Sequence, residues 1–251
     1  MVDPYIIPNT DVLKNKLGIT NSKELDEAES MISAIKLIDV DEVKGNFDYK
    51  HLMDIHKHIF GDIYDWAGEA RIIDIEKSER VLAGASVKYG HHNSISEEAL
   101  KAINDLKAVK WQDLKSYDEK AQLFSKHLAR LWQVHPFREG NTRTVTEFCV
   151  QYASTQNIYL DKQLFAKNPA FFRNSLVLAS IGEYSEYSHL ETIIKDSMQR
   201  GDKMREEKKN QEKGIFSLNG LKEIDTKIKS NQETKNIDRY RSQKLDKDER
   251  E

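Results

Sequence analysis

Residues 135–143 read His-Pro-Phe-Arg-Glu-Gly-Asn-Thr-Arg and gather a base, an acid and two arginines around one Gly-Asn pair. This composition is unusual for a turn with only a structural role. One apolar stripe with helical spacing ends near Trp132, and another begins near Val145. The segment is therefore predicted to join the C-terminus of one helix to the N-terminus of the next.

Each residue type in this segment suits one part of a phosphate-transfer site. His135 follows a helix C-terminus, where a histidine can accept a proton from a hydroxyl near neutral pH. Gly140, Asn141 and Thr142 open the next helix, and the free N–H groups of a helix N-terminus bind anions such as phosphate. Arg143, on the first turn, adds a planar fork that matches phosphate oxygens.

Glu139 stands among these anion-binding groups. It would repel phosphates unless a divalent cation lay between them, so it implies Mg²⁺, which takes carboxylate and phosphate oxygens together. Phe137 is apolar within a polar loop and is expected to anchor that loop to the core. Together the residues predict phosphoryl or nucleotidyl transfer to a hydroxyl, with the protein supplying positioning and charge.

The segment resembles the signature H-x-F-x-[D/E]-G-N-G-R-x-x-R of Fic-domain proteins. It matches that signature at six of eight defined positions, which are His135, Phe137, Glu139, Gly140, Asn141 and Arg143. Residues 59–68 (Ile-Phe-Gly-Asp-Ile-Tyr-Asp-Trp-Ala-Gly) also look like the stretch that precedes the flap in Fic enzymes, and residues 11–19 look like the opening of many bacterial Fic proteins. The resemblance implies an all-α fold, a helical bundle with a short β-hairpin flap over the active site.

The resemblance further implies a Mg²⁺-dependent protein adenylyltransferase, which moves AMP from ATP to a Ser, Thr or Tyr hydroxyl of a target protein. By position, His135 is the general base, Glu139 holds Mg²⁺, and Arg143 neutralises the pyrophosphate that leaves. The implied nucleotide contacts also include Gly140, Asn141, Thr142, Asp62 and Ile63. The flap at residues 72–82 is expected to align the target segment by adding a strand to it.

Two residues depart from the signature. Thr142 replaces its second glycine, which costs about 1–2 kcal/mol if the backbone needs positive φ and little if the residue lies in the first helical turn. Thr146 replaces the final arginine and removes one cation from the phosphate site. In the family that arginine also pairs with an inhibitory glutamate; the best match here, Glu24, fits poorly, so we hypothesise that such autoinhibition is absent or weak.

Two alternative functions stay open at this point. One is a phosphotransferase similar to Doc, in which the nucleotide lies in the reverse orientation; the retained Gly140 and Asn141 argue against it. The other is a catalytically weakened Fic module that acts by binding proteins. ATP is the family's usual nucleotide, but the motif does not define the pocket for the base, so UTP or another nucleotide stays an alternative.

The elements that must position these residues are mostly helices. Apolar stripes fit helices that carry Leu25 to Ile38, Leu52 to Phe60, Ala121 to Trp132, Val145 to Tyr152, Leu176 to Ile181 and Leu190 to Ile194. Helix-start pairs recur at Asn21/Glu24, Ser94/Glu97, Ser116/Glu119 and Ser188/Glu191. Only residues 70–82 break the helical pattern, and Ile72 to Leu82 read as a β-hairpin.

Composition limits the remaining choices. The chain has 251 residues, a net charge of −3 and one cysteine, which excludes an intrachain disulfide framework. No apolar run is long enough to span a membrane and no secretory signal is visible, so we expect a cytoplasmic protein or a translocated effector, with neither nucleic acid nor membrane as partner. Residues 1–200 are predicted to form the Fic domain. Residues 201–251, with 26 charged residues, are predicted to be a helical or partly disordered tail that could bind an antitoxin or regulator.

Overall fold

The computed structural model describes residues 3–213. The chain divides into two units, residues 1–202 and residues 203–251. In the second unit the described residues, 203–213, are helical. The predicted tail therefore lies largely outside the described residues, and its role as a docking segment stays a prediction.

Helices dominate the described chain, and the predicted all-α class is confirmed. Residues 3–213 contain no strand, only a single antiparallel bridge between Ile6 and Leu13. None of the helices in this part of the chain is long and apolar enough to cross a membrane. The α-helices are α1 (Ser22–Lys36), α2 (Tyr49–Phe60), α3 (Ile95–Ala108), α4 (Tyr117–Val134), α5 (Asn141–Thr155), α6 (Gln163–Lys167) and α7 (Pro169–Leu178), and residues 188–202 are also helical. Short 3₁₀ helices form at Val40–Glu42, Arg80–Leu82, His92–Ser94, Trp111–Asp113 and Gly182–Tyr184.

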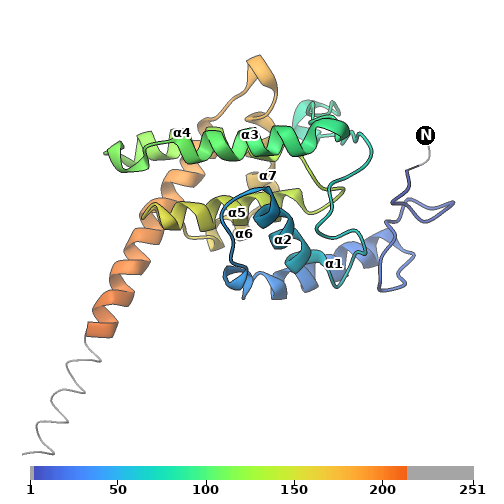
Figure 1. The fold of residues 1–251 in the computed structure, drawn as a ribbon, viewed down its shortest axis with the longest axis horizontal. Coiled ribbons are helices and arrows are strands. Elements are labelled where there is room, and N and C mark those ends of the chain that lie inside the picture. Colours follow the sequence, from blue (N-terminus) through green and yellow to red (C-terminus); the bar gives the residue numbers. More distant parts are fainter. Residues whose placement is uncertain (1–2, 214–251) are drawn as a thin grey trace, which may run out of the picture. The chain divides into compact units, whose positions relative to one another are not determined.

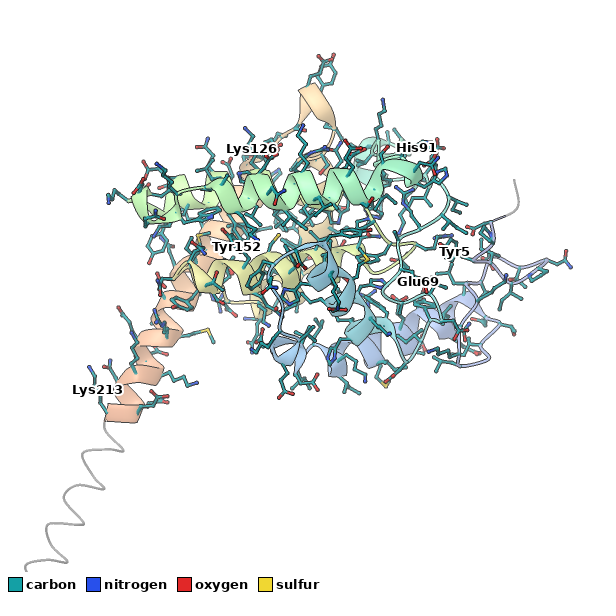
Figure 2. All side chains as sticks on the ribbon, in the orientation of Figure 1. Tyr5, Glu69, His91, Lys126, Tyr152 and Lys213 are labelled. Carbon is teal, nitrogen blue, oxygen red and sulfur yellow. The ribbon has the colours of Figure 1, made fainter. Side chains whose placement is uncertain are left out.

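Helix α5 lies between α4 and α2 in the first unit (Figure 1). Helix α3 packs along α4, while α2 packs on α5 and carries α1 on its other side. Side chains fill the spaces between these helices: Tyr152 of α5 is 5% exposed, whereas Lys126 points outward from α4 (Figure 2). The loop between α4 and α5 therefore joins two helices that each bury one face in the core.

The predicted helix starts agree with the structure to different degrees. Asn21 accepts a hydrogen bond from Glu24 N, and Ser116 forms a complete capping box with Glu119. Ser94 is the N-cap of α3 without a side-chain bond, and the last helix includes Ser188 itself. Local sequence therefore located each start within one residue.

The apolar stripe predicted for the first helix is only partly correct. Leu25 is buried, but Ile35 is 60% exposed, and Ile38 beyond the helix is 81% exposed. The inward face of α1 instead buries Glu29 and Ser33. The reason is the neighbour of this face, which is a charged cavity rather than apolar core.

The predicted β-hairpin at residues 72–82 is not formed. Residues 72 and 73 form a bend, residues 74–79 form no helix or strand, and residues 80–82 form a 3₁₀ helix. The chain reverses later than predicted, at Ala83 and Gly84, which both have positive φ. Across this turn Glu79 N donates to Ala85 O (3.0 Å), but two residues earlier Lys77 N donates to the Ser86 hydroxyl (3.1 Å) rather than to a carbonyl, so the two sides do not continue as a strand ladder.

We call residues 71–90 the flap loop. Its two ends are held together by Arg71, whose side chain is fully buried. Arg71 Nε donates to His135 O (2.9 Å), and its terminal nitrogens donate to the carbonyls of Ile73 and Gly90. The buried guanidinium of Arg71 thus joins both ends of the flap loop to the segment between α4 and α5.

Replacing this guanidinium tests its structural importance. Arg71→Met leaves the three carbonyls without their donor, so we expect a loss of about 3 kcal/mol or more in the free energy of unfolding. We also expect faster proteolytic cleavage within residues 72–90. Urea denaturation and limited proteolysis measure both effects, with Arg80→Ala, at an exposed position of the same loop, as the control. Equal stability of the two variants would contradict this role.

Candidate active site

His135 caps the C-terminus of α4 in the left-handed conformation, with φ of +51°. Its side chain is 2% exposed. The imidazole stacks on the ring of Tyr89 (4.0 Å between centroids, 30° between planes) and meets Trp132 edge-on at 5.1 Å. The flap loop and the end of α4 therefore fix the plane of this ring.

The hydrogen bonds of His135 define which nitrogen can act as a base. Nδ1 lies 3.3 Å from Trp132 O, and because a carbonyl only accepts, Nδ1 carries the hydrogen. Nε2 then holds the lone pair, and it has no hydrogen-bond partner. Burial lowers the pKa of His135 well below 6.5, and the charge of Lys77 lowers it further. At neutral pH the ring is a neutral proton acceptor.

Buried side chains hold the loop that follows His135. Phe137 is fully buried, as predicted, and stacks on His56 (3.7 Å, 9°). His56 accepts from Gly68 N (2.9 Å) through Nδ1, so its Nε2–H donates to Glu139 O (3.1 Å). Burial lowers the pKa of His56 to about 3, which keeps this donor and acceptor pattern neutral.

Asn141 clamps the same loop rather than pointing into open space. Its Nδ2 donates to Phe137 O (2.7 Å), and its Oδ1 accepts from Phe137 N (2.9 Å). The side-chain amide therefore shapes the loop with one donor and one acceptor bond, and Asn141 also offers a backbone N–H at the start of α5.

The start of α5 requires glycine at position 140. Gly140 has φ of +80°, and a Cβ there would lie 2.3 Å from the ring of Phe60. Thr142 lies one residue inside the helix and has no positive φ. The threonine therefore costs little, and its hydroxyl accepts a hydrogen bond from Trp132 Nε1 (3.0 Å).

A cavity of about 560 Å³ opens beside this loop. It is lined by His135, Glu139, Gly140, Asn141, Thr142 and Arg143, so the structure brings the predicted motif residues together. It does not bring Asp62 and Ile63 there. Ile63 is fully buried in the core and Asp62 pairs with Lys36 (2.7 Å) at the surface, because the turn that ends α2 directs them away from the cavity. These two residues are removed from the candidate site.

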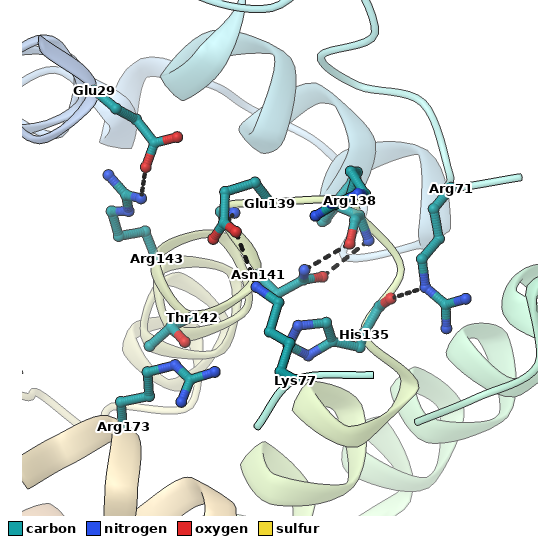
Figure 3. A network of polar contacts seen from close by, with 12 residues as sticks. Glu29, Arg71, Lys77, His135, Arg138, Glu139, Asn141, Thr142, Arg143 and Arg173 are labelled. Carbon is teal, nitrogen blue, oxygen red and sulfur yellow. Dashed lines mark hydrogen bonds and ion pairs between the residues drawn. The ribbon is translucent and has the colours of Figure 1, made fainter. Parts of the chain in front are cut away.

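The cavity also gathers charges from distant segments (Figure 3). Arg143 donates to Glu29 and to Ser33 Oγ (2.6 Å) on α1, and its guanidinium covers the ring of Phe60 at 4.7 Å. Lys77 of the flap loop pairs with Glu139 (Nζ–Oε2, 2.9 Å). The charges of Arg143 and Glu139 are thus each balanced by a partner more than 60 residues away in the sequence.

A third pair of charges joins α7 to the flap loop. Arg173, from α7, holds the carboxylate of Glu79 with two parallel hydrogen bonds, one of them 2.7 Å long. Tyr89, whose ring stacks on His135, donates its hydroxyl to the same carboxylate (3.2 Å). Glu79 is 4% exposed. The flap loop is thus tied to α7 by an ion pair between a buried carboxylate and a half-buried guanidinium.

Glu139 has the properties of a ligand for a hard cation. Burial raises the pKa of its carboxyl, but the charge and hydrogen bond of Lys77 and the N–H of Gly140 outweigh this and lower it to about 2. The carboxylate stays charged and already holds one cation, the Lys77 ammonium, at 2.9 Å. One carboxylate beside an anion-binding helix end fits Mg²⁺, which keeps most of its ligands as water and phosphate.

Sequence reasoning missed Glu29, Lys77 and Arg173. Glu24 was considered as the inhibitory glutamate, but it is exposed in the first turn of α1, and Glu29, five residues later, contacts Arg143. Glu29 and Ser33 are four residues apart and both are buried on α1. This spacing could have indicated Glu29 as a site residue only once the orientation of the helix was known.

Comparisons with known proteins show the family to which the chain belongs. A sequence profile of the Fic/DOC family matches residues 46–153. Protein adenylyltransferase VbhT of Bartonella schoenbuchensis is 35% identical over 163 residues, which cover 63% of this chain and 32% of that protein. The probable protein adenylyltransferase y4lH of Sinorhizobium fredii is 30% identical over 185 residues, which cover 72% of this chain and 90% of that protein.

A solved structure gives the same result for the fold. BepC, a VirB-translocated effector protein of Bartonella tribocorum solved with bound AMPPNP, matches with a TM-score of 0.63 and 21% identity, covering 77% of this chain and 95% of that one. The chain belongs to the Fic/DOC family. It spans about a third of VbhT and nine-tenths of y4lH.

The close approach of Gly140 to Phe60 predicts a large effect of a small substitution. We expect Gly140→Ala to lower the free energy of unfolding by about 2 kcal/mol or more, because it adds ring overlap to backbone strain. Gly182→Ala is the matched control, since Gly182 has a similar φ of +74° but nothing within 4 Å of its Cβ position. Urea denaturation compares the two variants, and equal losses would contradict the Phe60 contact.

The buried histidines predict how the protein responds to pH. We expect His135 and His56 to stay neutral well below pH 6.5, which an NMR titration of the imidazole carbons measures, with His135→Gln to assign the resonance. The unfolded chain binds protons near pH 6.5 while the folded chain does not, so the free energy of unfolding should fall as pH drops below 6.5. Titration of either ring at pH 6.5 or above in the folded protein would contradict the burial argument.

Proposed function

We propose that this chain is a protein adenylyltransferase, which transfers AMP from ATP to a Ser, Thr or Tyr hydroxyl of a target protein or of itself. The observation that carries the proposal is one cavity that holds a neutral base with an unused lone pair beside an anion-binding helix N-terminus. The family and the names of VbhT and y4lH support the same reaction.

His135 is the proposed general base. As the hydroxyl oxygen of the target attacks the α-phosphorus, its proton passes to Nε2 of His135, and the bond between the α-phosphorus and the bridging oxygen breaks to release pyrophosphate. Nε2 is covered in the structure. A target hydroxyl can therefore reach this nitrogen only when the side chains above it shift.

The start of α5 is the proposed phosphate site. The N–H groups of Asn141, Thr142 and Arg143 precede the first intrahelical bond, which runs from Thr144 N to Gly140 O, so they are available to phosphate oxygens. The Arg143 fork lies on the same turn and would neutralise the leaving pyrophosphate. Glu139 would hold Mg²⁺, which supplies charge neutralisation at the phosphates when bound.

The flap loop is the proposed contact for the target protein. Residues 72–77 form no helix or strand and line a hollow together with Asp3, His92 and Arg138. A segment without strand partners can pair with an incoming peptide through its backbone groups. Partners of the C-terminal tail and a location in the cytoplasm or as a translocated effector remain predictions.

Labelled nucleotides test the reaction directly. The purified chain is incubated with Mg²⁺, host lysate and ATP that carries the label on the α- or the γ-phosphate. We expect protein labelling from the α-position only, and a loss of at least 100-fold in His135→Ala, because the step then lacks its base. His127→Ala, a histidine on α4 outside the cavity, is the matched control.

Other outcomes distinguish the alternatives. Labelling from the γ-position only would identify a phosphotransferase and reverse the assigned orientation of the nucleotide. Nucleotide binding without any labelled protein, in the lysate or in the chain itself, would favour a binding module. Equal labelling by the wild-type chain and His135→Ala would refute the assignment of the base.

A further inference from the structure

The phosphate site of this chain lacks one cation at the position where the family signature has its final arginine. Thr146 occupies that position, one turn after Arg143. Its hydroxyl has no hydrogen-bond partner and carries no charge. Helix α5 therefore supplies a single guanidinium to a cavity proposed to hold three consecutive phosphate groups.

A second guanidinium enters the same cavity from a different helix. Arg173, on α7, lines the cavity with Thr142, Arg143 and His135 (Figure 3). The Arg173 guanidinium also lies 5.9 Å from the centre of the Trp132 ring, whose Nε1 donates to Thr142. Arg173 thus stands beside the first turn of α5, the proposed phosphate site.

We propose that Arg173 binds the terminal phosphates of the nucleotide, and so replaces the arginine that position 146 lacks. This inference rests on the proposed function in one respect, that the ligand is a nucleoside triphosphate. It goes further in assigning a phosphate contact to a residue outside the motif. The arrangement needs no change of fold, because the guanidinium already faces the cavity.

The geometry of the Arg173–Glu79 pair supports a phosphate contact. Glu79 offers two carboxylate oxygens to the two terminal nitrogens of Arg173, which is the paired geometry that a phosphate also presents. Glu79 therefore occupies the fork that a phosphate would use. Binding of phosphate exchanges one anion for another, and Glu79 keeps its hydrogen bond from the Tyr89 hydroxyl (3.2 Å).

The competing explanation is that the Arg173–Glu79 pair only fastens the flap loop to α7. The two explanations predict different signs for two substitutions. If the pair is only a fastener, Arg173→Gln and Glu79→Gln break the same link and weaken nucleotide binding alike. If Glu79 competes with phosphate, removing its charge strengthens binding while removing that of Arg173 weakens it.

Calorimetric titrations with the α,β-methylene analogue of ATP, with AMP and with inorganic tripolyphosphate measure these effects on the full-length chain. We expect Arg173→Gln to weaken binding of the ATP analogue and of tripolyphosphate roughly 10- to 100-fold, as for loss of a charged hydrogen-bond pair. AMP binding should change less than about twofold, because AMP lacks the terminal phosphates. Glu79→Gln should strengthen binding of the ATP analogue several-fold.

Three further variants separate the contact from a structural effect. Thr146→Arg in the Arg173→Gln background should restore much of the lost affinity, and Arg173→Lys should retain part of it. Arg130→Gln removes an arginine that pairs with Glu98 outside the cavity and should leave binding unchanged. Melting temperatures of all variants show whether folding contributes.

The results separate this inference from the proposed function. Unchanged affinity for the ATP analogue in Arg173→Gln, or weakening of similar size in Arg173→Gln and Glu79→Gln, would overturn the phosphate contact. If the analogue and tripolyphosphate bind through Arg173 but no α-label reaches protein, the contact stands and the transfer reaction fails. Failure of the wild-type chain to bind either ligand would overturn both.

Discussion

The short connection between α4 and α5 is the constraint on which the rest of the site depends. One helix ends at Val134 and the next begins at Asn141, so the chain must reverse within a few buried residues. Both ends of this connection take positive φ, at His135 and Gly140. Buried backbone groups in such a turn need partners, since each one left unpaired costs about 1–3 kcal/mol.

Side chains from elsewhere in the chain supply these partners. Arg71 bonds to the carbonyl of His135, His56 bonds to the carbonyl of Glu139, and Asn141 satisfies both backbone groups of Phe137. These bonds fix the position of His135, the proposed base, relative to the N-terminus of α5. Positioning of this kind is what a transfer reaction requires from the protein.

The charges around the loop follow a second rule, which is that a buried charge needs a counter-charge. Arg143 has Glu29, Lys77 has Glu139, and Arg173 has Glu79. Each of these three cations thus already has a carboxylate partner within the protein. The proposed nucleotide and its Mg²⁺ would have to exchange partners with these pairs, so the affinity of the site would depend on the difference between two sets of ion pairs rather than on one set alone.

The sequence predicted what is local and missed what is distant. Residues 135–143 are adjacent in the chain, so their chemistry could be inferred from types and spacing alone, and the helices around them follow from apolar periodicity and caps. Glu29 and Arg173 lie 114 and 30 residues from Arg143, and no periodicity links them to it. The prediction of a hairpin at residues 72–82 was wrong for a similar reason. Residue types that fit a strand do not show whether a partner strand exists.

Helix α1 shows how the second rule overrides hydrophobic patterning. Its Met31 and Ile35 are 68% and 60% exposed, although burying one such side chain is worth about 1.5–3 kcal/mol. Turning the helix to bury them would expose Leu25 in exchange and would separate Glu29 from Arg143, and an uncompensated buried charge costs about 3–5 kcal/mol. The charged contact therefore decides which face of α1 points inward. The helix is placed by the site that it completes rather than by the core that it covers.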